Sequence, residues 1–191
     1  MMKIRNPHPK VLDGSTPKFV GLSGRDRGLA VQQSYEDAGI TTNWAEGLDL
    51  PQFGEEIKTF TPSNDITIGT YKSRDLLNTD GKVCLNKLGC AHQWHEFDKY
   101  NVKRKTHYVD FRLIRDIIER DLKALTDDFR THPEYGYNKW TCAKSKYFIL
   151  EWTRPESKAT GVKLRIRASK VKNLITLTGQ PTFNKLFKEV V

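Results

Sequence analysis

The sequence predicts an α+β fold, in which one long amphipathic helix packs on a C-terminal antiparallel sheet after an irregular N-terminal arm. Apolar residues recur every three or four positions from Tyr108 to Arg130, the period of a helix with one buried face. Runs rich in aromatic and branched residues follow this helix, and a helix before a series of strands is typical of α+β proteins. Residues 1–65 hold five of the eight prolines and seven of the 13 glycines, so long elements are not expected there.

The N-terminal arm, residues 1–65, is expected to contain one short helix at Leu29–Ala38, which Gly39 ends. Two interpretations of the arm stay open. It either extends from the domain and packs on another molecule, or forms a loop-rich cap on the same domain. The rest of the chain, residues 66–191, is expected to form the α+β domain with its basic sheet.

Short elements are expected between the arm and the long helix. Ile66–Tyr71 alternates between apolar and polar residues and has the composition of a strand. Lys82–Leu88 is expected to be a weak strand or a loop, and Ala91–Tyr100 a short helix. These segments would complete the domain around the long helix.

The long helix is the clearest element of the sequence. Asp116 and Arg120, like Glu119 and Lys123, are acid–base pairs four residues apart, which support a helix modestly. The proline of His132-Pro133 ends it, because a residue before proline disfavours the helical conformation. Its apolar stripe consists of Phe111, Ile114, Ile118, Leu122, Leu125 and Phe129.

Three strands are expected after the long helix, at Lys146–Thr153, Val162–Ser169 and Leu174–Thr178. Gln180-Pro181 breaks this pattern. Phe183–Val190 is then expected to be a short terminal helix, capped by Thr182.

The formal net charge of +9 narrows the classes of function. Residues 139–191 carry twelve Lys and Arg but three Asp and Glu, so the whole excess lies there. Charge concentrated in this way attracts phosphates or acidic protein surfaces.

No apolar run reaches the roughly 18 residues of a membrane span, so a membrane protein is not expected. Three cysteines do not make a disulfide framework, which predicts a reducing, intracellular and cytoplasmic location.

The strand Val162–Ser169 carries the main candidate binding site. Alternation points Lys163, Arg165 and Arg167 to one face at spacings of about 6.6 Å, close to the spacing of phosphates along a nucleic-acid strand. An ordinary solvated face is the alternative, but three like charges in a row are unfavourable without a partner. Nearby basic and aromatic residues would contact phosphates and stack on bases: Lys170, Lys172, Lys144, Lys146, Tyr147 and Trp140.

A second basic cluster, Lys103, Arg104 and Lys105, is expected in a loop before the long helix. It would either contact phosphate or be solvated like most exposed charges.

Cys84, Cys90, His92 and His95 lie within twelve residues, and all four are residue types that bind zinc. Their spacing departs from the common Cys-x2–4-Cys and His-x3–5-His pairs. The favoured interpretation is therefore two small buried thiols with surface or capping histidines. Neither a metal nor another cofactor is expected.

Catalytic signals are weak. The glycine-rich stretch Gly21–Gly28 lacks the Lys-Ser/Thr of a phosphate-binding loop. Glu151 is a lone carboxylate on the strand before the basic one. Pairing with Arg165 or Arg167 across the hairpin explains it better than metal-dependent cleavage.

These observations predict a non-enzymatic protein that grips the phosphate backbone of a nucleic acid with a basic C-terminal sheet. The first alternative is an assembly or inhibitor protein, in the style of a small viral protein, that docks on an acidic protein surface and joins a larger assembly through residues 1–65. The second is a metal-dependent nuclease. No helix-turn-helix or finger pattern indicates sequence-specific readout.

Overall fold

The structure is a computed structural model that describes residues 21–131, 142–153 and 161–178. The fold is mixed α+β, as the sequence predicts in outline. The expected terminal helix Phe183–Val190 and the candidate Trp140 lie outside the described residues.

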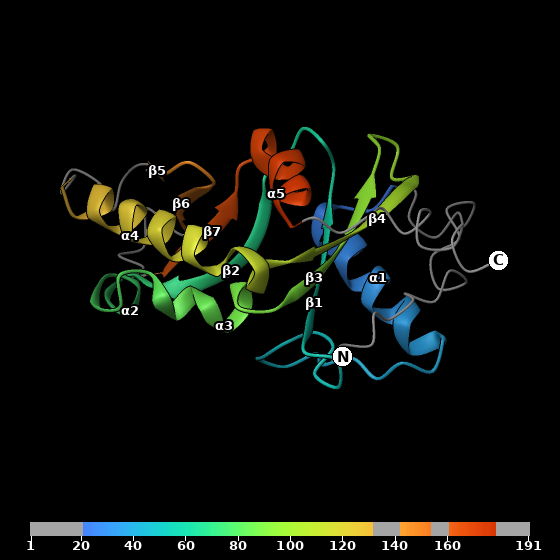
Figure 1. Ribbon diagram of the computed structural model, residues 1–191. Helices are drawn as coiled ribbons and strands as arrows, with labels where there is room; N and C mark the ends of the chain where they lie inside the picture. Colours follow the sequence, from blue (N-terminus) through green and yellow to red (C-terminus); the bar gives the residue numbers. More distant parts are fainter. Residues whose placement is uncertain (1–20, 132–141, 154–160, 179–191) are drawn as a thin grey trace.

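The strands form two small sheets (Figure 1). In sheet A, β3 (Ala91–Phe97) lies between β1 (Glu55–Phe60), which runs parallel to it, and β4 (Lys103–Asp110), which runs antiparallel. Sheet B is antiparallel and has the order β2-β7-β6-β5. Its strands are β2 (Ile66–Lys72), β5 (Cys142–Lys144), β6 (Phe148–Trp152) and β7 (Gly161–Ile166). The prediction of a single antiparallel sheet is therefore only partly correct. Sheet B is antiparallel, but a second sheet, sheet A, is mixed.

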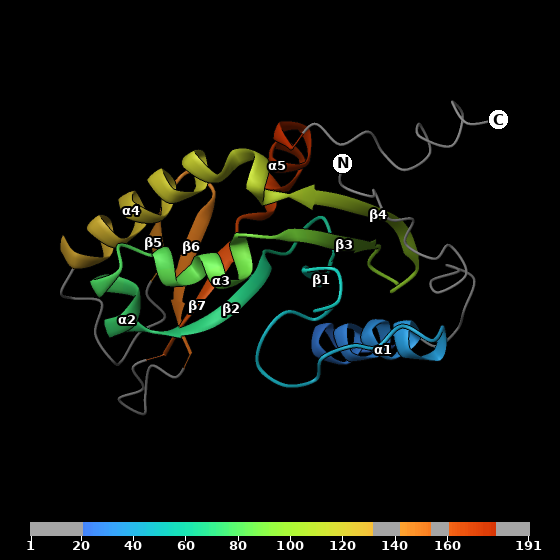
Figure 2. The same cartoon turned by 60° about the horizontal axis from the view of Figure 1, so that its bottom comes forward.

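The helices cover different parts of these sheets. The helix α4 (Arg115–Thr131) packs on β5 and β6 of sheet B, whereas α1 (Gly24–Asp37) packs on β1 of sheet A (Figure 2). Two short helices, α2 (Ser73–Asn78) and α3 (Leu85–Leu88), lie between β2 and β3, and a third, α5 (Val171–Leu177), follows β7. No helix within the described ranges is long and apolar enough to cross a membrane.

The long helix keeps its predicted stripe but begins later than predicted. Ile118, Leu122, Leu125 and Phe129 are buried in the main core, at the predicted spacing. Tyr108 belongs instead to β4, which pairs with β3 along its whole length. Pairing with a neighbouring strand thus overrides the local helical pattern at the start of the segment.

Three predicted elements are wrong in type. Lys82–Leu88, expected to be a weak strand or a loop, is helical: a 3-10 helix at Lys82–Cys84 leads directly into α3. The expected helix Ala91–Tyr100 is the strand β3, the middle strand of sheet A, buried on both faces. Such a strand does not alternate between apolar and polar residues, so its period is not visible in the sequence. The expected strand Leu174–Thr178 lies largely in α5, whose buried Val171 and Leu174 have helical spacing. Its β-branched composition suggested a strand. That expectation failed because β propensity depends on context.

The helix α1 ends as predicted. Gly39 has a φ of 78°, the left-handed conformation that favours glycine after a helix. Its N–H donates to the Glu36 carbonyl at 2.8 Å, and the Ile40 N–H donates to the Tyr35 carbonyl at 2.9 Å. Val31 and Tyr35 then pack with Ile57 and Phe97 in a second apolar cluster. Residues 21–65 therefore supply one strand of sheet A and the helix that packs on it. The division of the chain at residue 65 stays a prediction.

Candidate nucleic-acid interface

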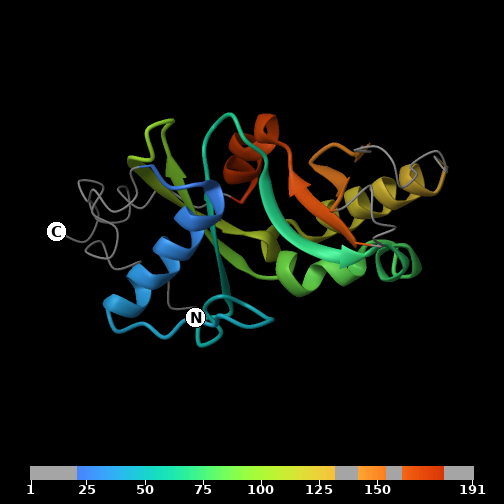
Figure 3. The same cartoon turned by 180° about the vertical axis from the view of Figure 1, so that it is seen from behind.

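The basic strand β7 has the orientation that alternation predicts. Val162, Leu164 and Ile166 are fully buried in the main core, while Lys163 and Arg165 are half-buried on the opposite face. That face points away from α4, and no helix of the described residues crosses β2 and β7 there (Figure 3). We call it the outer face of sheet B.

The neighbouring strand β2 adds a cation and two hydroxyl groups that sequence reasoning missed. Thr70 lies opposite Lys163, and Thr67 lies opposite Arg165. An irregularity between Thr67 and Gly69 shifts the register, so that Thr67 and Thr70 both point outward although they are three residues apart. Lys72 follows on the same side and is exposed. The described outer face consists of Thr67, Thr70, Lys72, Ile149, Glu151, Lys163 and Arg165.

The space for a side chain at Gly69, beside the irregularity, is tight. A Cβ atom at Gly69 would lie 3.1 Å from Tyr71 Oη and 3.3 Å from the Lys87 side chain. Tyr71 is buried on the inner face of the strand. The sequence signal was the break in alternation within Ile66–Tyr71, which period-two reasoning overlooks.

The predicted ion pair across the hairpin is confirmed. Arg165 Nη1 donates to Glu151 Oε2 at 2.7 Å, whereas the buried Arg165 Nε has no hydrogen-bond acceptor in the described structure. Glu151 therefore offsets the charge of Arg165 and orients its guanidinium. Lys163 forms no hydrogen bond or ion pair with another described residue, although its backbone is paired with Glu151.

Arg167 is not the third cation of the row, because β7 ends at Ile166. Its side chain donates from Nη1 to the Ser145 carbonyl at 3.0 Å, and its backbone N–H donates to the Tyr147 carbonyl at 2.9 Å. Ala168–Lys170 forms a 3-10 turn instead of continuing the strand. Arg167 thus joins the end of β7 to the turn between β5 and β6.

The aromatic stacking expected of Tyr147 is contradicted, because this side chain is only 2% exposed and belongs to the main core. Lys146 beside it is exposed, with its ammonium group 5.1 Å from the centre of the Tyr147 ring. Lys170 is half-buried and Lys172 exposed, and both lie beyond the end of β7. Lys144 is in β5, where side chains lie outside the described residues.

Asp121 of α4 holds the β5–β6 turn that carries Lys146. Its carboxylate accepts hydrogen bonds from Ser145 Oγ at 2.8 Å and from the backbone N–H groups of Lys146 and Tyr147 at 3.0 and 2.9 Å. The turn is therefore fixed to the helix that covers the inner face of sheet B.

We expect Asp121→Ala to lower the free energy of unfolding by about 2 kcal/mol, because two backbone donors and a hydroxyl lose a charged acceptor. Urea unfolding measures the change. Asp116→Ala on the same helix is the control, since this exposed side chain holds no turn. Equal losses in both variants would contradict the role of Asp121.

The second basic cluster lies in the edge strand β4 of sheet A and not in a loop, which corrects the prediction. Arg104 Nη2 is 2.5 Å from Asp98 Oδ2, and Lys105 is exposed. Backbone hydrogen bonds and Arg104 hold the pKa of Asp98 below its usual value. Charged residues on an edge strand oppose pairing with a second chain, and Lys103, Arg104 and Lys105 fit that role without a phosphate.

The four possible zinc ligands do not form a site. Cys90 Sγ and His92 Nε2 both contact the Lys87 carbonyl, at 3.0 and 2.7 Å, while His95 contacts the Tyr35 hydroxyl at 3.1 Å. No three His, Cys, Asp or Glu side chains in the described part of the chain are grouped to hold a metal. The expectation of two buried thiols is confirmed for Cys84 and Cys90. The expectation that the histidines lie at the surface or cap a helix is wrong, because His92 and His95 are fully buried.

Burial keeps these groups uncharged at neutral pH. It raises the pKa of the Cys84 and Cys90 thiols to about 12. It lowers the pKa of His92 to about 3, with nearby Lys58 adding to the shift, and it holds the pKa of His95 well below the usual value. Neither thiolate nor imidazolium chemistry is supported at these positions.

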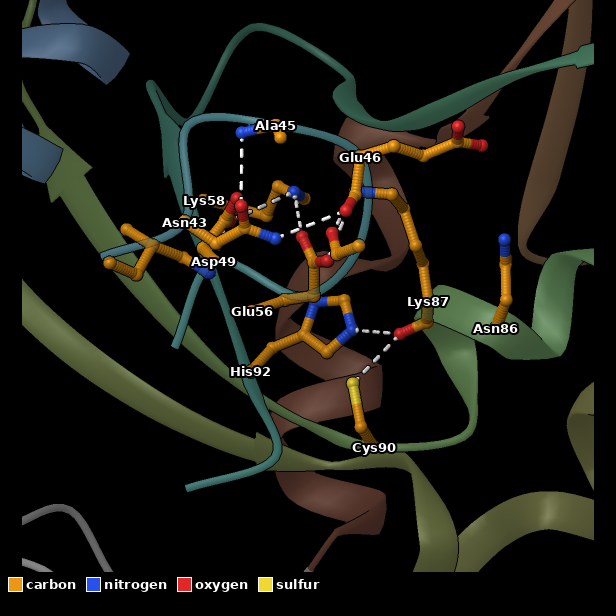
Figure 4. A network of polar contacts seen from close by, with 12 residues as sticks. Asn43, Ala45, Glu46, Asp49, Glu56, Lys58, Asn86, Lys87, Cys90 and His92 are labelled. Carbon is orange, nitrogen blue, oxygen red and sulfur yellow. Dashed lines mark hydrogen bonds and ion pairs between the residues drawn. The ribbon is translucent and has the colours of Figure 1, made fainter. Parts of the chain in front are cut away.

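A buried ionic network lies beside His92 (Figure 4). The Glu56 carboxylate has no exposed surface, and it pairs with Lys58 and, at 3.0 Å, with Lys87 Nζ. Lys58 Nζ is also 3.5 Å from Asp49 Oδ2. Sequence reasoning missed this network, because nothing in the residues around Glu56 indicates its burial in β1.

Comparison with known proteins found no family model, no curated protein and no solved structure that matches this chain.

Proposed function

We propose that this protein is a non-enzymatic nucleic-acid-binding protein that holds a phosphate backbone on the outer face of sheet B. The observation that carries the proposal is the row formed by Lys72, Lys163 and Arg165 on adjacent strands. Lys163 has no ion pair with another described residue, which supports a role in binding a ligand.

The balance of charge on this face favours an anion. Three cations face one described carboxylate, Glu151, which is already engaged by Arg165. Thr67 and Thr70 add hydroxyl donors between the cations, and hydroxyls and guanidinium groups are frequent donors to phosphate oxygens. A sheet with helices on one face and an open polar face is also a common platform for nucleic acids.

The proposed contacts are to phosphate, so binding should depend on salt more than on base sequence. Each phosphate contact contributes about 0.7–0.9 to the slope of log affinity against log salt concentration. We expect Lys72→Ala/Lys163→Ala to reduce that slope by about 1.4–1.8 and to weaken binding about tenfold or more at low salt. Fluorescence anisotropy with labelled single- and double-stranded DNA and RNA measures both quantities.

The matched control is Arg115→Ala/Lys123→Ala, which removes the same charge from α4 on the opposite side of sheet B. Both control residues are exposed and form ion pairs only within their own helix among the described residues. Equal weakening by the two double variants would show that net charge, not the outer face, governs binding. If the wild-type protein binds none of the four nucleic acids at low salt, the proposal is wrong, and the acidic-protein alternative is left.

A further inference from the structure

A cavity of about 540 Å³ opens at the edge of the outer face. Thr70 and Lys72 line it on one side, and both also belong to the outer face. The loop 46–48 and the helix α3 form other walls. Its volume lies within the range of about 300–1,000 Å³ that is usual for small-molecule pockets. A ligand on the outer face therefore has a pocket beside it.

The charges around the cavity favour a neutral ring with N–H donors over a phosphate. Lys87 lines the cavity, but its ammonium group is already bound to Glu56 Oε1 at 3.0 Å and to the Gly47 carbonyl at 3.2 Å. Glu46 and Asp75 add two carboxylates to the lining. Lys72, at the side shared with the outer face, is the lining cation that forms no ion pair with a described residue.

The remaining walls combine apolar surface with an amide. Leu48 and Val83 supply aliphatic surface, and the Tyr71 ring contributes to the lining from β2. Tyr71 Oη donates to Asn86 Oδ1 at 3.2 Å, which leaves the Asn86 amide nitrogen as a donor. In Figure 4 the Asn86 amide and the Glu46 carboxylate lie on the same side of the Lys87 side chain.

We infer that this cavity takes one unstacked base of a single-stranded nucleic acid whose phosphates lie along Lys72 and Lys163. The inference rests on the proposed function and deepens it. A base within a duplex cannot enter a side pocket without being flipped out, whereas a single strand presents its bases freely. The carboxylates of Glu46 and Asp75 can accept from an exocyclic amino group, so adenine, cytosine and guanine fit better than thymine or uracil.

The test compares a labelled single-stranded adenine oligonucleotide with the same strand in which every base is removed. We expect the wild-type protein to bind the intact strand at least about fivefold more tightly, because enclosed bases contribute measurably to single-strand affinity. A thymine strand should lie between the two. Asn86→Trp, which places a large ring at an exposed position of the cavity wall, should abolish the preference and keep the salt dependence.

Asn78→Trp is the matched control, since Asn78 is exposed and does not line the cavity. The inference is overturned if Asn86→Trp still binds the intact adenine strand more tightly than the strand without bases. It is also overturned if the wild-type protein shows no such preference. The proposed function still stands in that case if Lys72→Ala/Lys163→Ala loses affinity.

If no oligonucleotide binds, the proposed function is wrong. Binding of free adenosine then tests whether the cavity is a base site. Amide shifts of Gly47, Val83 and Asn86 in an NMR titration with millimolar adenosine, abolished by Asn86→Trp, would support a base site. Unchanged amide positions in the wild-type protein would overturn it.

Discussion

Glu56→Ala is expected to lower the free energy of unfolding by about 3 kcal/mol. The substitution leaves the ammonium groups of Lys58 and Lys87 partly buried without their carboxylate, and breaking one side of a buried ion pair costs far more than losing an exposed one. Burial raises the pKa of Glu56, and the two ammonium groups oppose that shift. Urea unfolding at pH 7.5 measures the loss.

Two further variants separate charge from packing. Glu56→Gln keeps the shape of the side chain and removes its charge, so it should retain most of the destabilisation. Glu119→Ala removes a carboxylate from the more exposed pair with Arg115 on α4, and it should cost no more than about 0.5 kcal/mol. A Glu56→Gln protein as stable as the wild type would show that the ionic network does not stabilise the fold.

Lowering the pH from 7.5 to 5.5 is expected to reduce the free energy of unfolding by about 3 kcal/mol through His92 and His95. Both side chains are buried and have lowered pKa values in the folded protein, to about 3 for His92. The unfolded chain takes up a proton on each histidine as the pH falls through about 6.5, and the folded protein does not. Stability is therefore complete above that pH and falls below it by about 1.4 kcal/mol per pH unit for each histidine.

The contacts of the His92 ring oppose its protonation, because Nδ1 already accepts a hydrogen bond, whereas His95 is kept neutral mainly by burial. His92 Nε2 donates to the Lys87 carbonyl and its Nδ1 accepts from Trp94 Nε1 at 3.3 Å. His95 lies between the Tyr35 hydroxyl and Thr106 Oγ1. Unfolding by urea at several pH values gives the slope directly. His92→Gln and His95→Gln should each remove about half of it, and an unchanged slope in both would assign the pH dependence to other groups.

Local patterns predicted the elements whose burial is one-sided. The stripe of α4 and the alternation of β7 were visible because each element presents one face to the core and the other to solvent. The strand β3 was not visible, since both of its faces are buried and it carries His92, Gln93 and His95 inside. Polar residues in a buried strand depend on partners from distant segments, such as the Gln93 amide that donates to Glu55.

The candidate site was predictable along one strand but not across strands. Alternation gave Lys163 and Arg165, and the neighbouring strand gave the Glu151 partner. The contribution of Lys72 required knowing that β2 pairs with β7, with an irregularity at Gly69. Tyr147 resembled a stacking residue because its burial results from packing in the main core, which a sequence of basic and aromatic residues does not reveal.

The pairing of β2 with β7 also constrains the order in which the chain can fold. Ile66 pairs with Ile166, so β2 leaves the ribosome long before its strand partner exists. Sheet A needs only residues up to Asp110 and, with α1, has its own apolar cluster. During synthesis, sheet A and α1 can therefore assemble first while β2 waits as an unpaired edge, the state in which a nascent chain is most exposed to aggregation.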